Sequence, residues 1–378
     1  MQISNALSPL LLVLLIVSSG SSADSSTFDV RGSAGTRLTA TAFDEFDTPW
    51  AMTFLPDGRL LVSEKTGALV LVGSDGRRRG VIEGIPATRA AGQGGLGDVV
   101  LHPAFADNGL VYLSYVERDG SRSGAVVVRG TLSLEQNGGR LRNLERIWEQ
   151  IPKLDGNGHY SHRLAFGPDG RLFISSGDRQ RQTPAQDLSN NLGTIVRLEA
   201  DGSIPVDNPF ADRGGVAREF WTVGHRNPLG LTFARDGTLY SNEMGPRGGD
   251  ELNRIVPGEN YGWPTVSDGE NYSGRDIPDH ATDPSFKAPL ISWVPSISPA
   301  GLIIYDGDLF GSWRGQALMG GLSSRALVRV SIGADRATEQ ERFEWGERIR
   351  EVEQGPDGAL WVLEDGRGGR LVRLEPAD

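Results

Sequence analysis

The sequence predicts an all-β fold, a six-bladed β-propeller with four-stranded antiparallel blades, and three observations support this. Glycine is abundant, with 51 of 378 residues, and turn dipeptides such as Asp-Gly recur. A strand–turn–strand pattern repeats six times along the chain. No long window shows the 3.6-residue apolar periodicity of a helix. A two-sheet sandwich with chance turns is the alternative.

Each copy of the repeat is an apolar strand, a tight turn containing glycine and a second apolar strand. The clearest copies are residues 54–62, 166–174, 233–240 and 354–362, and looser copies lie at 106–113 and 312–319. The turn glycines, spaced 43 to 78 residues apart, are Gly58, Gly109, Gly170, Gly237, Gly315 and Gly358. This spacing is typical of a four-stranded blade plus variable loops. We therefore expect residues 24–378 to form a single propeller domain.

The first 23 residues carry no charge and include the apolar run Leu10–Val17, followed by small residues ending at Ala23. This pattern predicts a secretory signal peptide that is cleaved near Ala23, and hence a periplasmic or secreted protein. A short membrane anchor is the alternative, but eight consecutive apolar residues cannot span a bilayer.

The formal net charge of −11 argues against a nucleic acid or an anionic membrane surface as partner. No other segment is apolar enough to insert into a membrane. The chain has no cysteine, which excludes disulfides, thiolate metal sites and a cysteine nucleophile.

Two of the five histidines, His159 and His162, flank a loop that enters a predicted blade strand. Histidine is the commonest general base near neutral pH, and a carboxylate can orient it. A hairpin could bring Asp178 to His159 as that carboxylate. The other three histidines are weaker candidates for a catalytic role. His102 lies at a predicted strand end, His225 precedes the candidate residues Arg226 and Asn227, and His280 is expected to be a solvated loop residue.

Two arginine clusters suit an anionic, carbonyl-rich ligand. Arg226 and Asn227 precede a proline and combine a fixed cation with an amide; a surface salt bridge with an Asn turn is the alternative. Arg348 and Arg350 would point the same way from one strand and could clamp carboxylates. The alternative for this second pair is an exposed strand whose arginines pair with neighbouring glutamates.

The segments Glu243–Asn253 and Asn260–Pro264 are rich in glycine, proline and carboxylates. Backbone carbonyls with Asp250 and Glu251 are hard oxygen ligands, which indicate Ca²⁺ as a candidate metal. By contrast, Gly92–Gly97 matches a dinucleotide-binding pattern only superficially, because an apolar strand follows it instead of a helix. Gln93 remains a possible polar contact in that loop.

Taken together, these clusters resemble the soluble quinoprotein glucose and aldose sugar dehydrogenases, six-bladed propellers that bind pyrroloquinoline quinone (PQQ). The resemblance runs from Pro49 to Leu374 and is closer to the bacterial aldose sugar dehydrogenase branch. Its motifs are Gly92-Gln-Gly-Gly-Leu, His159-x-x-x-Arg163, Gly224-x-Arg-Asn-Pro, Gly245-Pro-Arg-Gly-Gly-Asp-Glu, Asn260-Tyr-Gly-Trp-Pro and Arg348-x-Arg350.

The resemblance implies a role for each matching position. His159 would remove the hydroxyl proton of the sugar, with Asp178 orienting it, and Arg226 would stabilise negative charge on the quinone oxygen. The implied PQQ contacts are Gln93, His159, Arg226, Asn227, Tyr272, Arg348 and Arg350. The implied calcium ligands are the carbonyls of Gly245 and Pro246, together with Glu251 and Tyr261.

The implied activity is oxidation of the anomeric hydroxyl of aldose sugars to lactones by hydride transfer to calcium-bound PQQ, with an external electron acceptor. We expect a monomer or homodimer. A calcium-dependent lactonase and a non-catalytic binding propeller are the alternatives. Three positions depart from the family: Ser323 stands where a cofactor-contacting Lys is expected, which Arg325 could replace; Leu229 replaces Gln; and His162 could alter access to the site.

Overall fold

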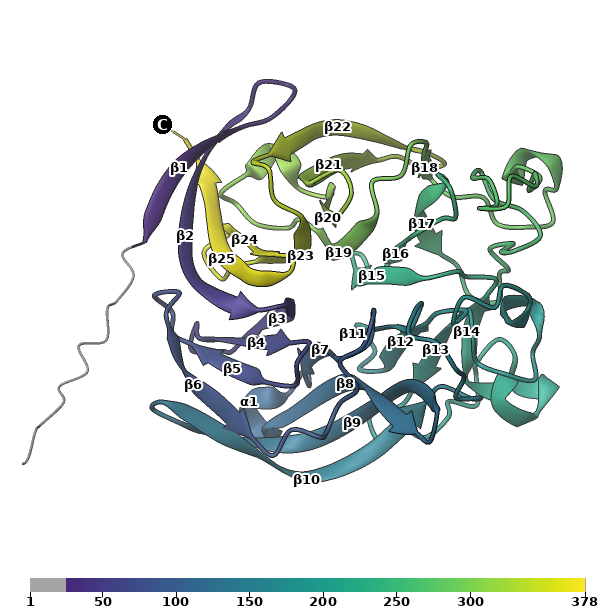
Figure 1. Ribbon diagram of the computed structural model, residues 1–378, viewed down its shortest axis with the longest axis horizontal. Coiled ribbons are helices and arrows are strands. Elements are labelled where there is room, and N and C mark those ends of the chain that lie inside the picture. Colours follow the sequence, from purple (N-terminus) through teal and green to yellow (C-terminus); the bar gives the residue numbers. More distant parts are fainter. Residues whose placement is uncertain (1–24, 378) are drawn as a thin grey trace, which may run out of the picture.

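The computed structural model describes residues 25–377, so the predicted signal peptide lies outside the described residues. The chain is built mainly of strands, and its sheets are arranged around a common centre (Figure 1). Several of these sheets are four-stranded and antiparallel, which confirms the predicted all-β class and is consistent with a propeller. No helix in the described part of the chain is long and apolar enough to cross a membrane.

Three sheets each consist of four consecutive strands, every strand pairing with the next in antiparallel fashion. Their strands are β11 (Ser161–Phe166), β12 (Leu172–Ser176), β13 (Thr194–Leu198) and β14 (Phe220–Val223); β15 (Pro228–Phe233), β16 (Leu239–Glu243), β17 (Asp250–Ile255) and β18 (Ile291–Trp293); and β19 (Pro299–Ile304), β20 (Ala317–Gly321), β21 (Ala326–Ile332) and β22 (Ala337–Glu344).

An eight-stranded sheet joins two such units. The units are β3 (Pro49–Phe54), β4 (Leu60–Glu64), β5 (Leu69–Val72) and β6 (Arg78–Glu83), then β7 (Leu96–Leu101), β8 (Leu110–Asp119), β9 (Arg122–Glu135) and β10 (Gly138–Glu149). A short parallel pairing between β6 and β10 joins the two units into one sheet. The helical elements are short: α1 (Phe105–Asn108) and 3₁₀ turns at Thr183–Gln186, Ala211–Arg213, Gly215–Glu219, His280–Thr282 and Gly311–Trp313.

The fifth sheet joins the two ends of the described chain. It contains β1 (Ser26–Arg31), β2 (Arg37–Asp47), β25 (Arg367–Pro376), β24 (Leu360–Glu364) and β23 (Ile349–Gln354). Strand β2 pairs with β25 from Leu38 opposite Pro376 to Asp47 opposite Arg367. The first strands of the units contact one another in turn, from β3 through β7, β11, β15, β19 and β23 back to β3.

All six predicted turn glycines lie between the first and second strands of a unit, with φ values from 63° to 85°. This is the left-handed region in which glycine carries no steric penalty. The two looser copies differ from a tight hairpin. Helix α1 precedes Gly109 and a 3₁₀ turn precedes Gly315, because these connections carry extra residues.

Candidate active site

Two adjoining cavities of about 370 and 810 Å³ lie at one end of the strands and share Gln93, Met244 and Ser298 in their linings. Two kinds of loop build them. One kind leads into a first strand and the other leaves a second strand, and antiparallel pairing puts both at the same end of the sheet. The first kind supplies Thr48, Gln93, His159, Arg226, Ser298 and Arg348, and the second supplies Lys65, Met244, Ser323 and Asp365.

The hairpin β11–β12 brings His159 and Asp178 together, with Nδ1 of His159 2.6 Å from Oδ1 of Asp178. Both side chains are buried, and His159 lines the larger cavity. His159 has a φ of 49°, and its backbone N–H donates to Oε1 of Gln93 at 2.7 Å. A non-glycine residue in this region is strained and needs such support from its surroundings.

Burial, more than the surrounding charges, favours a neutral imidazole at His159. Burial lowers the pKa of His159, the hydrogen bond with Asp178 opposes this, and the charge of Arg226 lowers the pKa further. Burial alone would raise the pKa of Asp178, but the hydrogen bonds from His159 and Trp263 and the charge of Arg226 bring it below its ordinary value. Asp178 therefore accepts the Nδ1 proton, which leaves Nε2 of His159 free to accept another proton.

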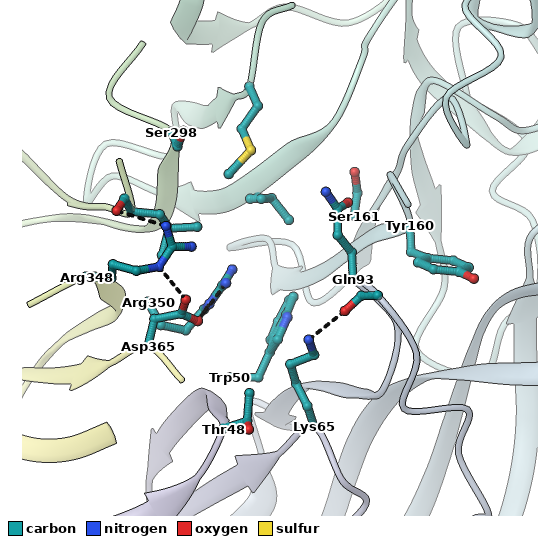
Figure 2. Close-up of a pocket in the computed structure, with 14 residues that line it drawn as sticks. Thr48, Trp50, Lys65, Gln93, Tyr160, Ser161, Ser298, Arg348, Arg350 and Asp365 are labelled. Atoms are coloured by element: carbon teal, nitrogen blue, oxygen red, sulfur yellow. Dashed lines mark hydrogen bonds and ion pairs between the residues drawn. The ribbon is translucent and has the colours of Figure 1, made fainter. Parts of the chain in front are cut away.

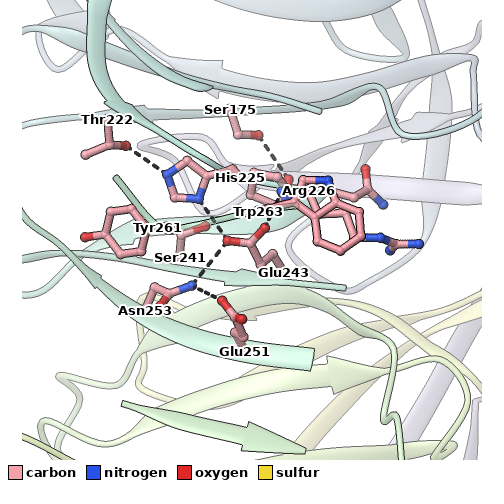
Figure 3. A network of polar contacts seen from close by, with 12 residues as sticks. Ser175, Thr222, His225, Arg226, Ser241, Glu243, Glu251, Asn253, Tyr261 and Trp263 are labelled. Atoms are coloured by element: carbon pink, nitrogen blue, oxygen red, sulfur yellow. Dashed lines mark hydrogen bonds and ion pairs between the residues drawn. The ribbon is translucent and has the colours of Figure 1, made fainter. Parts of the chain in front are cut away.

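Trp263 is a further partner of Asp178. Its Nε1–H donates to Oδ2 of Asp178 at 2.8 Å, and its ring lies 5.2 Å from the guanidinium of Arg226 (Figure 3). It belongs to the Asn260–Pro264 motif noted in the sequence, but the pattern assigned no role to its side chain.

Arg226 is 5% exposed and its guanidinium forms no ion pair with a carboxylate among residues 25–377, so the alternative of a surface salt bridge is wrong. Its Nη1 donates to the Met244 carbonyl at 2.8 Å, and its backbone N–H donates to Glu243 at 2.6 Å. Tyr272 is largely exposed at the cavity rim, with its hydroxyl 3.5 Å from Nη2 of Arg226. Asn227 is fully buried and accepts a hydrogen bond from Ser161.

Arg348 and Arg350 extend to the same carboxylate. Each Nε donates to Asp365 at 2.8 Å, which confirms that the two side chains point the same way (Figure 2). The alternative pairing with neighbouring glutamates is wrong for Glu351, which binds Arg163 instead. Arg325 lies away from both cavities and donates to the Gly346 carbonyl. No sequence pattern indicated Lys65, which lines the smaller of the two cavities.

The four candidate calcium ligands lie in two places. Gly245 and Pro246 line the larger cavity, where Asp250 holds the Gly245 N–H at 2.9 Å. Within the described chain, neither the Gly245 nor the Pro246 carbonyl accepts a hydrogen bond. Glu251 and Tyr261 line a smaller space of about 10 Å³ that adjoins this cavity, because Arg226, Met244 and Gly245 border both.

His280 is buried and not the solvated residue that the sequence suggested. Its Nε2 lies 3.2 Å from the Tyr261 carbonyl and its Nδ1 3.3 Å from Asp268. Burial opposes its charge, but the Asp268 hydrogen bond and the Glu251 carboxylate raise the pKa of His280 to about 9. The cationic His280 side chain therefore lies beside Tyr261 and Glu251, two of the candidate calcium ligands.

The remaining histidines have structural contacts. His162 is buried, contacts Ser114 at 2.7 Å and stacks on Trp50, which lines the smaller cavity, while His162 itself lines neither cavity. Burial lowers the pKa of His162 to about 3. His225 is buried and bonds to Glu243 at 2.8 Å (Figure 3).

Comparisons with known proteins agree in what the chain resembles. The sequence profile of the glucose / sorbosone dehydrogenase family matches residues 46–373. The aldose sugar dehydrogenase YliI of Escherichia coli (strain K12) is 38% identical over 340 residues, covering 88% of this chain and 91% of that protein.

Two solved structures are also similar. The apo-form of the soluble aldose sugar dehydrogenase from Escherichia coli has a TM-score of 0.86 and 36% identity, covering 90% of this chain and all of that one. The PQQ-bound form of an aldose sugar dehydrogenase from Streptomyces coelicolor has a TM-score of 0.71 and 27% identity, covering 93% of this chain and 98% of that one.

Proposed function

Because the chain belongs to the glucose / sorbosone dehydrogenase family, we propose that it is a PQQ-dependent aldose sugar dehydrogenase. Its reaction is oxidation of the anomeric hydroxyl of an aldose to a lactone. When bound, PQQ supplies the two-electron acceptor for the hydride, which no amino-acid side chain can provide. The PQQ-bound relative supports this choice of cofactor.

The observation that carries the proposal is that His159, hydrogen-bonded to Asp178, and Arg226 line the same cavity. Nε2 of His159 accepts the hydroxyl proton of the sugar, and the nearby Asp178 carboxylate stabilises the imidazolium that results. Arg226, whose guanidinium forms no ion pair with a carboxylate in the described chain, stabilises negative charge that develops on the acceptor oxygen.

The lining residues fit a planar, carboxylate-rich group. Arg348 and Arg350 face the smaller cavity, Gln93 borders both cavities, and Tyr272 lies at the rim. The free carbonyls of Gly245 and Pro246 suit Ca²⁺, which prefers oxygen ligands. Side chains alone would not hold this ion, because no three His, Cys, Asp or Glu side chains converge as a metal-binding group between residues 25 and 377.

We extend the proposal to the architecture and the location. The eight-stranded sheet is counted as two blades, because its two four-stranded halves are joined by a parallel pairing of only two residue pairs between β6 and β10, and this count gives a six-bladed propeller. The uncharged, apolar segment before Ala23 supports export to the periplasm, where an external acceptor would reoxidise the cofactor. Cell fractionation with an antibody against the mature chain tests the location.

The test of function is to purify the mature protein, load it with PQQ and Ca²⁺, and measure dye reduction with several aldoses and alcohols. We expect activity with aldoses, and His159→Ala should lower kcat at least about a hundredfold. Absence of both quinone binding and activity would refute the proposal. Hydrolysis of sugar lactones in place of dye reduction would identify the lactonase alternative.

A further inference from the structure

Lys65 lies directly after β4 and extends into the smaller cavity, opposite Arg348 and Arg350 (Figure 2). Its Nζ donates one hydrogen bond, to the Gly92 carbonyl at 2.8 Å. No carboxylate lies within 4 Å of Nζ in the described part of the chain. An ammonium group has three N–H donors, so two of them remain for a ligand.

The cavity around Lys65 has an excess of positive charge. Three cations line it, and Asp365 is the one carboxylate in the lining, already shared between Arg348 and Arg350. Burial lowers the pKa of Lys65, the charge of Arg350 lowers it further, and Asp365 only partly opposes this. An anionic ligand would relieve the repulsion among these cations.

Arg325 does not replace the cofactor-contacting Lys that the family resemblance leads us to expect at Ser323. Its guanidinium is turned toward the Gly346 carbonyl, and Ser323 uses its hydroxyl to bind the Ser296 carbonyl. Neither residue therefore supplies a cation to the cavities. Lys65 reaches the cavity from the end of β4, which is far from Ser323 in the sequence.

Resting on the proposed function, we propose that Lys65 is a cofactor-binding residue of this chain, whose ammonium group pairs with a carboxylate of PQQ beside Arg348 and Arg350. It supplies the positive charge that the sequence pattern led us to expect at Ser323 or Arg325. The Gly92 carbonyl holds the ammonium in position, so little side-chain freedom is lost when the ligand binds.

The test is PQQ binding by the apoprotein, measured by equilibrium dialysis at fixed Ca²⁺ and low salt, without any sugar or dye. Removing a hydrogen bond between charged groups should raise the Kd of Lys65→Met at least about tenfold. The Kd of Lys65→Arg should stay within about threefold of wild type, because the charge is kept. Arg325→Met is the matched control and should leave the Kd unchanged.

The ratio of the Kd of Lys65→Met to that of wild type should shrink as NaCl is raised, because salt screens the partly exposed ion pair between Lys65 and the PQQ carboxylate. Thermal unfolding of each variant checks that it folds. Equal PQQ affinity of Lys65→Met and wild type would overturn the inference, as would a loss in Lys65→Arg as large as that in Lys65→Met. If wild type itself binds no PQQ, the proposed function fails; if wild type binds and only these differences are missing, the role of Lys65 fails alone.

Discussion

Replacing Asp178 with asparagine should lower kcat by about 10²–10⁴-fold, because the amide cannot satisfy the donors around it. Each carboxylate oxygen accepts two hydrogen bonds. Oδ1 accepts from His159 at 2.6 Å and the Gln180 N–H at 2.8 Å. Oδ2 accepts from Trp263 at 2.8 Å and the Gln182 N–H at 3.1 Å. The NH₂ group of the introduced amide must therefore face at least one N–H donor.

The two orientations of the amide differ in cost. With NH₂ toward Trp263 and the Gln182 N–H, two donors lose their acceptor; with NH₂ toward His159, only the Gln180 N–H does. One additional unsatisfied donor costs about 1–3 kcal/mol, so the second orientation dominates by about 5- to 150-fold. It forces the His159 proton from Nδ1 to Nε2, which can then no longer accept the sugar proton. Loss of the carboxylate charge beside the imidazolium also lowers the stabilisation of the transition state by about 1.5–3 kcal/mol.

The assay is steady-state dye reduction by PQQ-loaded Asp178→Asn, with ¹⁵N NMR of the imidazole to identify the tautomer. Asp236→Asn is the matched control, because Asp236 caps an exposed turn at Thr238. PQQ affinity should be unchanged in both variants. A kcat for Asp178→Asn within about threefold of wild type, or an Nδ1-protonated His159 in that variant, would refute the reasoning.

Three further outcomes are expected. Since burial lowers the pKa of His159 from 6.5, kcat/KM should fall as the pH drops, with a midpoint below 6.5; a midpoint above about 7 would exclude His159 as the base. Arg163→Met leaves the buried Glu351 carboxylate without its ion-pair partner. Burial raises the pKa of Glu351 to about 7, although Arg163 opposes this. Urea unfolding at about pH 8 should therefore show a loss of about 3–5 kcal/mol in the free energy of unfolding. Because that carboxyl binds a proton more readily when folded, the loss should be smaller at about pH 5, and equal losses would contradict this account. Gly97→Ala would put a Cβ 2.0 Å from the buried ring of His162, so thermal unfolding should show about 1–3 kcal/mol of destabilisation, and an unchanged Tm would argue against the tight packing.

The sequence alone predicted the repeating part of the fold, because the required signals are local. A turn such as that at Gly170 needs a positive φ, and flanking apolar strands make the hairpin visible in nine residues. The same hairpin carries His159 and Asp178 at its two ends, so their meeting also followed from local sequence.

Contacts between distant segments could not be predicted in this way. Asp365, the shared partner of Arg348 and Arg350, is an exception, because it lies across the predicted hairpin at residues 354–362 and follows from the pairing of β23 with β24. His280 stands in a polar stretch that resembles a surface loop, yet tertiary packing buries it. Lys65 is a single lysine that follows β4, and no local pattern marks it. It lines the same cavity as Arg348 and Arg350 because the first and last units of the chain are neighbours in the fold.

The pairing of β2 with β25 determines the order in which the molecule can be completed. Asp47 and Arg367 lie opposite each other but at far ends of the described chain, so the fifth sheet cannot form until both segments are synthesised and, for an exported protein, translocated. The entropic cost of closing a loop grows only with the logarithm of its length. Joining the two segments therefore costs about 5 kcal/mol of chain entropy, an amount that the pairing of one sheet edge can offset. Until then the incomplete chain carries an open sheet edge at each side, which is exposed to chaperones and to proteases.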